Sequence, residues 1–339
     1  MPAPSARVRL ASVVHSERFN QMKWVVDMLA PLLLAILPIV VTLGLGFIAG
    51  WRQQFPANTS DSLIQLVMVY ALPLSLFGGI LTLKRAVIRE NLAVAGWLAV
   101  GMLGGLIVLI VSQRLQRVPL TAATLRALSI ASPSVPFMGT SVLLIVFGKI
   151  SILLVALGGL YMNLIQVPTS VFLLTLVGHE ATTSPWVTLQ RTLLTASQQP
   201  VVWAPILAFI LNLVGFKLPL QWLPLFTELG QAAGGVALFA LGLILAAHQL
   251  KVTRPIVKNV GLKNLALPLV VWLAMHLLGL PLLTQQLVVI TLAIPTAAIP
   301  TMLAVQQRLP ADEYVATQLL STLLAPITMG IFMLGLHVT

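Results

Sequence analysis

Cysteine is absent from this chain of 339 residues, and charged residues make up only 8% of it. Without cysteine, the protein forms neither disulfides nor thiolate metal sites. A soluble domain carries charge on about a quarter of its residues, so the low charge excludes an ordinary soluble fold. Hydrophobic residues account for 58% of the chain instead. The composition therefore predicts a protein that crosses the membrane several times.

Acidic residues are especially scarce. The chain holds eight Asp and Glu residues, and all of them lie outside the expected spans or at their ends. Proton relays inside membranes use such carboxylates, so we expect no obligatory proton coupling. His276 is the only ionisable side chain expected near the middle of a span, and its position near a helix end favours the membrane interface.

Basic residues give the chain a formal net charge of +11. They are expected in short loops between the apolar runs, Lys263 among them, with Arg126 and Lys149 at the two ends of a span. Basic residues in such loops set the orientation of a membrane protein. We therefore expect no nucleic-acid partner.

Motifs of membrane enzymes are missing as well. The sequence has no HExxH, no GxSxG and no pair of aspartates within an apolar run, which are the patterns of metal-dependent and serine hydrolases. We expect neither an enzyme nor a bound cofactor or metal.

Apolar runs of about 20 residues, the length that crosses a bilayer, predict an all-α fold with ten transmembrane spans. They are expected at residues 30–50, 62–83, 92–111, 121–147, 150–177, 200–214, 225–247, 264–278, 287–306 and 314–336. Residues 1–28 are predicted to form a disordered arm. The spans divide into one set of five within residues 29–177 and another within 200–339, joined by a loop at 178–199.

The two sets of spans resemble each other weakly. ALPLSLFGGILTLKR at residues 71–85 is similar to VALFALGLILAAHQLK at 236–251, and IASPS at 130–134 is similar to LAIPT at 292–296. Because five is an odd number, the second set must enter the membrane in the opposite direction. This is the inverted-repeat design of many transporters.

Proline pairs interrupt two corresponding spans. Pro133 and Pro136 lie in the fourth span, and Pro295 and Pro300 lie in the ninth. Proline lacks an N–H and clashes with the preceding turn, so each helix must break or kink. In hydrocarbon, a broken backbone is tolerated only against protein or a water-filled cavity. We predict two broken helices that cross near the middle of the membrane and form the substrate site.

Polar and small residues near the breaks are the candidate substrate contacts, because the start of a half-helix presents free N–H groups and a positive dipole end to an anion. In the fourth and ninth spans the candidates are Ser132, Ser134, Gly139, Thr140 and Thr296. An alternative is that these hydroxyls only cap backbone groups of their own helices.

The fifth span contributes two further candidates, Asn163 and Gln166. The alternative for these amides is that they hold neighbouring helices together.

Four segments resemble the auxin efflux carrier family, which includes bacterial malonate-transporter-like members. They are YALPLSLF at 70–77, ASPSVPFMG at 131–139, QPVVWAPILAFILNLVG at 199–215 and AIPTAAIP at 293–300. The resemblance implies ten spans in two inverted five-helix repeats with spans four and nine crossing, as in sodium/proton antiporters and bile-acid symporters. It also implies a scaffold of spans one, two, six and seven, and a domain that carries the substrate past it.

The chain departs from the plant members in ways that favour a bacterial carrier. Ser134 stands where plant carriers have asparagine, Ser141 replaces a second proline, and the long insert after the fifth span is reduced to residues 178–199. Auxin is therefore not the expected substrate.

The resemblance and the broken spans together predict a secondary carrier of a small organic anion, such as the dicarboxylate malonate, that works by alternating access. The expected location is the bacterial inner membrane, with both termini outside the cytoplasm. The alternatives are an anion channel and a receptor that does not transport. The oligomeric state is left open, with a homodimer as one alternative.

Overall fold

The computed structural model describes residues 37–38, 40–56, 58–82, 91–178, 194, 198–216, 218–247 and 252–338. Within these residues the chain is helical, and its only strand-like pairing is an isolated antiparallel bridge between Pro133 and Thr296. The predicted all-α class is confirmed. The predicted arm at 1–28 and most of the predicted loop at 178–199 lie outside the described residues.

Six helices are long and apolar enough to cross a membrane: Thr59–Leu81, Leu92–Leu115, Leu153–Val177, Leu223–Ala247, Arg254–Leu277 and Asp312–Gly335. Four shorter apolar helices are Val40–Trp51, Leu120–Ala131, Pro200–Leu213 and Leu282–Ala293. The protein is therefore a helical multi-pass membrane protein.

Several of these helices contain a π-helical turn, so each is described as two α-helices with a turn between them. They are α2 (Thr59–Leu66), η1 (Val67–Ala71) and α3 (Leu72–Leu81); α5 (Leu92–Ala99), η2 (Val100–Gly104) and α6 (Gly105–Leu115); α9 (Ser151–Tyr161), η5 (Met162–Gln166) and α10 (Val167–Gly178); and α14 (Arg254–Gly261), η7 (Leu262–Ala266) and α15 (Leu267–Leu277). The others are α7 (Leu120–Ala131), η3 (Val135–Gly139), α8 (Thr140–Phe147), α12 (Pro200–Leu213), α13 (Leu223–Ala247), α16 (Leu282–Ala293), α17 (Ile299–Gln306) and α18 (Asp312–Gly335). Short 3₁₀ turns precede α9 and α13.

Prolines explain three of the π-helical turns. Turns η1, η5 and η7 each end two residues before a proline, namely Pro73, Pro168 and Pro268. Proline has no N–H to donate to the carbonyl oxygen of the preceding turn, and the proline ring clashes with that carbonyl. The backbone takes up the clash by widening for one turn, which is the usual form of a π-bulge and is frequent at functional sites.

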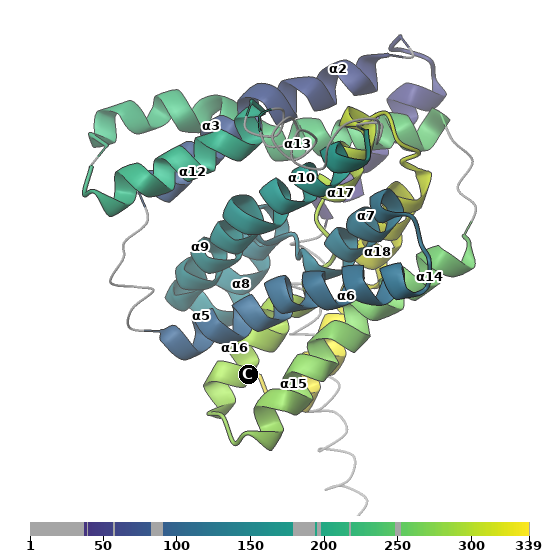
Figure 1. Cartoon of the computed structure of the whole chain (residues 1–339). Coiled ribbons are helices and arrows are strands. Elements are labelled where there is room, and N and C mark those ends of the chain that lie inside the picture. Colours follow the sequence, from purple (N-terminus) through teal and green to yellow (C-terminus); the bar gives the residue numbers. More distant parts are fainter. Residues whose placement is uncertain are drawn as a thin grey trace, which may run out of the picture.

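The helices form two layers (Figure 1). Helices α2, α3, α12 and α13 lie together along the upper side of the view, and α3 packs against both α12 and α13. We call these four helices and Val40–Trp51 the plate. The remaining helices form a larger body below it.

Glycine allows two helices of the plate to approach closely. A Cβ at Gly46 would overlap the carbonyl oxygen of Phe239, and one at Gly242 would overlap that of Leu43. Glycine is the only residue that fits such backbone contact, which membrane helices use for packing.

The eighth expected span differs most from the structure. It was predicted to begin at residue 264, but its helix begins at Arg254. The first turns of this helix are too polar to register as an apolar run, since they hold Arg254, Lys258, Asn259 and Lys263. As a consequence, Lys263 lies in a transmembrane helix and not in a loop.

Candidate functional site

The two proline-bearing breaks meet at the centre of the body. Helix α7 ends at Ala131, and the chain becomes helical again at Val135. Helix α16 ends at Ala293, and α17 begins at Ile299. Each end leaves backbone groups without partners inside its own helix.

The breaks satisfy each other's backbone groups. The N–H of Ser134 donates to the carbonyl oxygen of Pro295 over 2.8 Å, and the N–H of Ala297 donates to that of Ser132 over 3.0 Å. The four residues form a two-bond antiparallel bridge between segments far apart in the sequence. We call this bridge and its immediate neighbours the crossing.

A chain of side chains supports the ninth-span side of the crossing. The Thr296 hydroxyl donates to the carbonyl oxygen of Ser129 in α7, and the Thr296 N–H donates to the Ser321 hydroxyl over 3.1 Å. Ser321 in turn donates to the Asn264 side-chain oxygen over 2.6 Å. Thr296 is therefore bonded across the crossing and not to its own helix.

Gln166 supports the fourth-span side. Its side-chain NH₂ donates to the carbonyl oxygens of Met102, over 2.8 Å, and of Ala131, over 3.2 Å. Its side-chain oxygen accepts from the Ser132 hydroxyl over 2.7 Å. Gln166 is fully buried, so these bonds fix the end of α7 against η2 and η5.

Lys263 has the corresponding place on the ninth-span side. Its side chain is 0% exposed, and its Nζ donates to the carbonyl oxygen of Leu292 over 2.9 Å. Leu292 is the penultimate residue of α16, where the helix dipole is negative. Sequence reasoning missed this residue because the polar start of its helix looked like a loop. The expectation that His276 is the only ionisable side chain near the middle of a span is wrong, because the buried Lys263 lies beside the break of the ninth span. His276 itself is exposed in the last turn of α15.

The other predicted contacts lie close by. Ser134 is 9% exposed, and no hydrogen bond of its hydroxyl is found in the described part of the chain. The N–H of Gly139 donates to the carbonyl oxygen of Ser134 over 3.0 Å. The side chains of Pro136 and Thr140 are outside the described part. Pro300 is buried in the first turn of α17.

Asn163 is buried in η5, three residues before Gln166. Its side-chain oxygen has no hydrogen-bond partner in the described structure. An unpaired buried amide oxygen is costly, and it makes Asn163 available to a bound group. Its role as a substrate contact stays a prediction.

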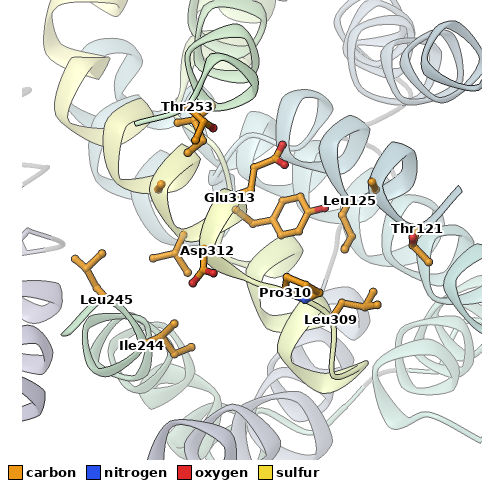
Figure 2. Close-up of a pocket in the computed structure, with 14 residues that line it drawn as sticks. Thr121, Leu125, Ile244, Leu245, Thr253, Leu309, Pro310, Asp312 and Glu313 are labelled. Carbon is orange, nitrogen blue, oxygen red and sulfur yellow. The ribbon is translucent and has the colours of Figure 1, made fainter. Parts of the chain in front are cut away.

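A cavity of about 490 Å³ lies between the plate and the body. It is bounded by α13 on one side and by α7, α14 and the start of α18 on the other, as Figure 2 shows. Its lining residues are Thr121, Ala122, Leu125, Ile244, Leu245, Thr253, Ile256, Leu309, Pro310, Asp312, Glu313, Tyr314, Val315 and Ala316. None of these residues belongs to the breaks, but Leu125 is one helical turn from Ser129.

Glu313 on the cavity wall is paired with Arg126. The Nε and Nη2 atoms of Arg126 donate to the two oxygens of Glu313 over 2.6 and 2.7 Å, and Asn259 donates to the first of them over 2.8 Å. The expectation that Arg126 lies at the end of a span, among the loop residues, is wrong, because Arg126 lies inside α7 and this bidentate pair holds α7 to α18 and α14. A bidentate pair is geometrically specific.

The described residues contain no cluster of three or more His, Asp or Glu side chains that could hold a metal ion. The arrangement instead offers hydroxyls, amides, half-helix ends and one buried ammonium group, all of which are suited to holding a polar solute without covalent chemistry.

Comparison with known proteins agrees with this arrangement. A family described as "Membrane transport protein" matches the chain in two segments, residues 31–185 and 168–333. The chain is 34% identical over 257 residues to the "Uncharacterized transporter YfdV" of Escherichia coli (strain K12), covering 71% of this chain and 78% of that protein. The proteins of the same name in Escherichia coli O157:H7 and Shigella flexneri match equally well.

Proposed function

The chain belongs to the membrane transport protein family, and we propose that it is a secondary carrier that moves a small organic anion by alternating access. Family membership makes it a transporter and not an enzyme, and it confirms the resemblance to auxin efflux carriers at the family level. The substrate, the bacterial malonate-type branch and the inner-membrane location are parts of the proposal.

The observation that carries the proposal is the mutual bonding of the two breaks. A gap in a transmembrane helix exposes backbone groups that lipid cannot satisfy. Here both gaps lie at one point, and two inter-segment backbone bonds close them. Secondary transporters bind their solutes at such paired gaps near the midplane.

An anion fits this point better than a cation does. The second half-helices begin at Val135 and Ile299, and helix starts attract negative charge through their N–H groups and dipoles. The described residues place no Asp or Glu among the groups bonded at the crossing. A carboxylate bound there would therefore meet donors and little repulsion.

The two layers support alternating access. We propose ten spans, counting α7 with α8 and α16 with α17 as one span each, arranged in two inverted repeats. The plate then corresponds to the scaffold of spans one, two, six and seven, and the body would carry the crossing past it. The cavity between the plate and the body supports an access path on one side.

Flux measurements in proteoliposomes test the proposal. Purified protein is reconstituted, and uptake of radiolabelled malonate, succinate and acetate is followed against protein-free liposomes. A carrier gives saturable flux at low turnover for at least one of them. An anion channel gives unitary currents in a planar bilayer, and a receptor gives binding without flux, so either result would replace the carrier by the corresponding alternative.

A homodimer stays a prediction, and it is tested by the mass of the purified protein in nanodiscs.

A further inference from the structure

Lys263 is a fully buried lysine, and no Asp or Glu side chain pairs with it within the described residues. An ammonium group has three donors, and the one hydrogen bond of Nζ within the described residues goes to the Leu292 carbonyl. The only Lys or Arg ion pair in that part of the chain joins Arg126 to Glu313. An ionised side chain buried within a membrane is costly, and it usually marks a substrate or ion pathway.

Capping of the broken helix does not explain the charge. On the other side of the crossing, the neutral amide of Gln166 donates to Ala131, the last residue of α7. Lys263 does the same for Leu292 near the end of α16. Because an amide is sufficient at one break, capping alone does not require a lysine at the other.

Helix α14 and the turn η7 connect a wall of the cavity to Lys263. Ile256 of α14 lines the cavity, Asn259 lies about one turn further along and bonds to the cavity residue Glu313, and Lys263 follows about one turn later. Residues at this spacing share one face of a helix. Lys263 therefore lies on the side of this helix that bounds the cavity.

We propose that Lys263 supplies the positive charge that balances the substrate anion at the crossing and so selects carboxylates over uncharged molecules of the same shape. The inference rests on the proposed function. Because Lys263 is fully buried behind Leu292, it acts through space across the end of α16 and not by direct contact. It is a positioning residue for the charge of the substrate.

The size of the effect follows from the electrostatics. For two unit charges at an assumed separation of about 10 Å and an effective dielectric constant of about 20, the Coulomb energy is about 1.7 kcal/mol. Removing one charge therefore changes affinity roughly tenfold.

The test compares charged and uncharged ligands. Malonate, succinate and acetate and their amides are titrated against purified protein in nanodiscs by calorimetry. Lys263→Met keeps an unbranched side chain without charge, and Lys263→Gln keeps an N–H donor and serves the same comparison if the methionine variant does not fold. Lys258→Met, which changes an exposed lysine of the same helix, is the matched control.

We expect Lys263→Met and Lys263→Gln to lose carboxylate affinity about tenfold with amide affinity unchanged. Lys258→Met and the charge-keeping Lys263→Arg should retain the preference for carboxylates. If the Lys263 variants lost affinity for carboxylates and for amides by the same factor, Lys263 would be only a structural cap. If neither affinity changed, the inference would also be overturned. Both results would leave the proposed anion carrier in place. Failure of the unmodified protein to bind any carboxylate would overturn the anion proposal itself, and the inference with it.

Discussion

Thr296 shows how single side chains hold the crossing together. Its hydroxyl donates to the carbonyl oxygen of Ser129, which has no intrahelical partner so close to the end of α7. Thr296→Val keeps the shape but leaves that buried carbonyl unpaired, so we expect the free energy of unfolding to fall by about 1–3 kcal/mol. Thermal unfolding in detergent measures the change.

Ser112→Ala is the control for Thr296→Val. The Ser112 hydroxyl donates to the carbonyl oxygen of Leu109 within the same helix, where the helical bond can replace it. We expect a change of less than about 0.5 kcal/mol. Equal destabilisation by both variants would show that the crossing bond has no special weight.

Ser134 is the predicted contact whose hydroxyl remains available. It is partly accessible and its side chain makes no bond in the described part of the chain, so Ser134→Ala should leave stability unchanged. If the hydroxyl binds a carboxylate, the lost bond to a charged group is worth about 1.5–3 kcal/mol, and affinity should fall roughly ten- to a hundredfold. Calorimetry with the carboxylate that binds most tightly measures the affinity of Ser134→Ala. Unchanged affinity would remove Ser134 from the site.

At the scale of the element, the π-helical turn η7 sets the direction of Lys263. It ends two residues before Pro268, whose missing N–H and bulky ring favour the widened turn. In Pro268→Ala the helix can close into regular α-helix, which would rotate Lys263 and Asn264 away from the crossing. We expect equal or higher thermal stability together with reduced flux in proteoliposomes.

Pro205→Ala offers the comparison for Pro268→Ala. Pro205 is a buried proline inside α12 of the plate, and α12 supplies none of the hydrogen bonds described at the crossing. We expect Pro205→Ala to leave substrate flux in proteoliposomes unchanged. If both alanine variants transport like the unmodified protein, the widened turn is only a response to proline and has no role in the site.

Prediction from sequence succeeded where a local rule was strong. The proline pairs at Pro133 and Pro295 predicted both breaks, because proline acts on its own backbone. Sequence-based prediction failed at Lys263 and Arg126, because both side chains bond to partners on other helices. Leu292 and Glu313 are distant in the chain, and a polar first turn gives no apolar signal from which the start of a helix could be recognised.

At the scale of the whole molecule, membrane orientation can be tested with single cysteines, because the chain has none of its own. Gln116 follows α6 and Gln221 precedes α13, and both are exposed. The predicted orientation has Gln116 on the cytoplasmic side. We expect an impermeant thiol reagent to label Gln221→Cys but not Gln116→Cys in intact cells.

Permeabilised cells provide the control for the labelling, since both cysteines should then react. The reverse pattern in intact cells would invert the orientation. The orientation depends on fewer loop charges than the sequence indicates, because Arg126 and Lys263 lie within helices of the body.

The crossing also constrains how the protein folds during synthesis. The carbonyl oxygen of Ser129 has no partner until Thr296 is synthesised, 167 residues later. At about 5–20 residues per second, the gap after α7 stays open for roughly ten to thirty seconds inside or beside the insertion machinery. A nascent chain stalled between the two breaks should therefore be an obligate client of membrane chaperones or quality-control proteases, and separately expressed halves should survive only when they are made together.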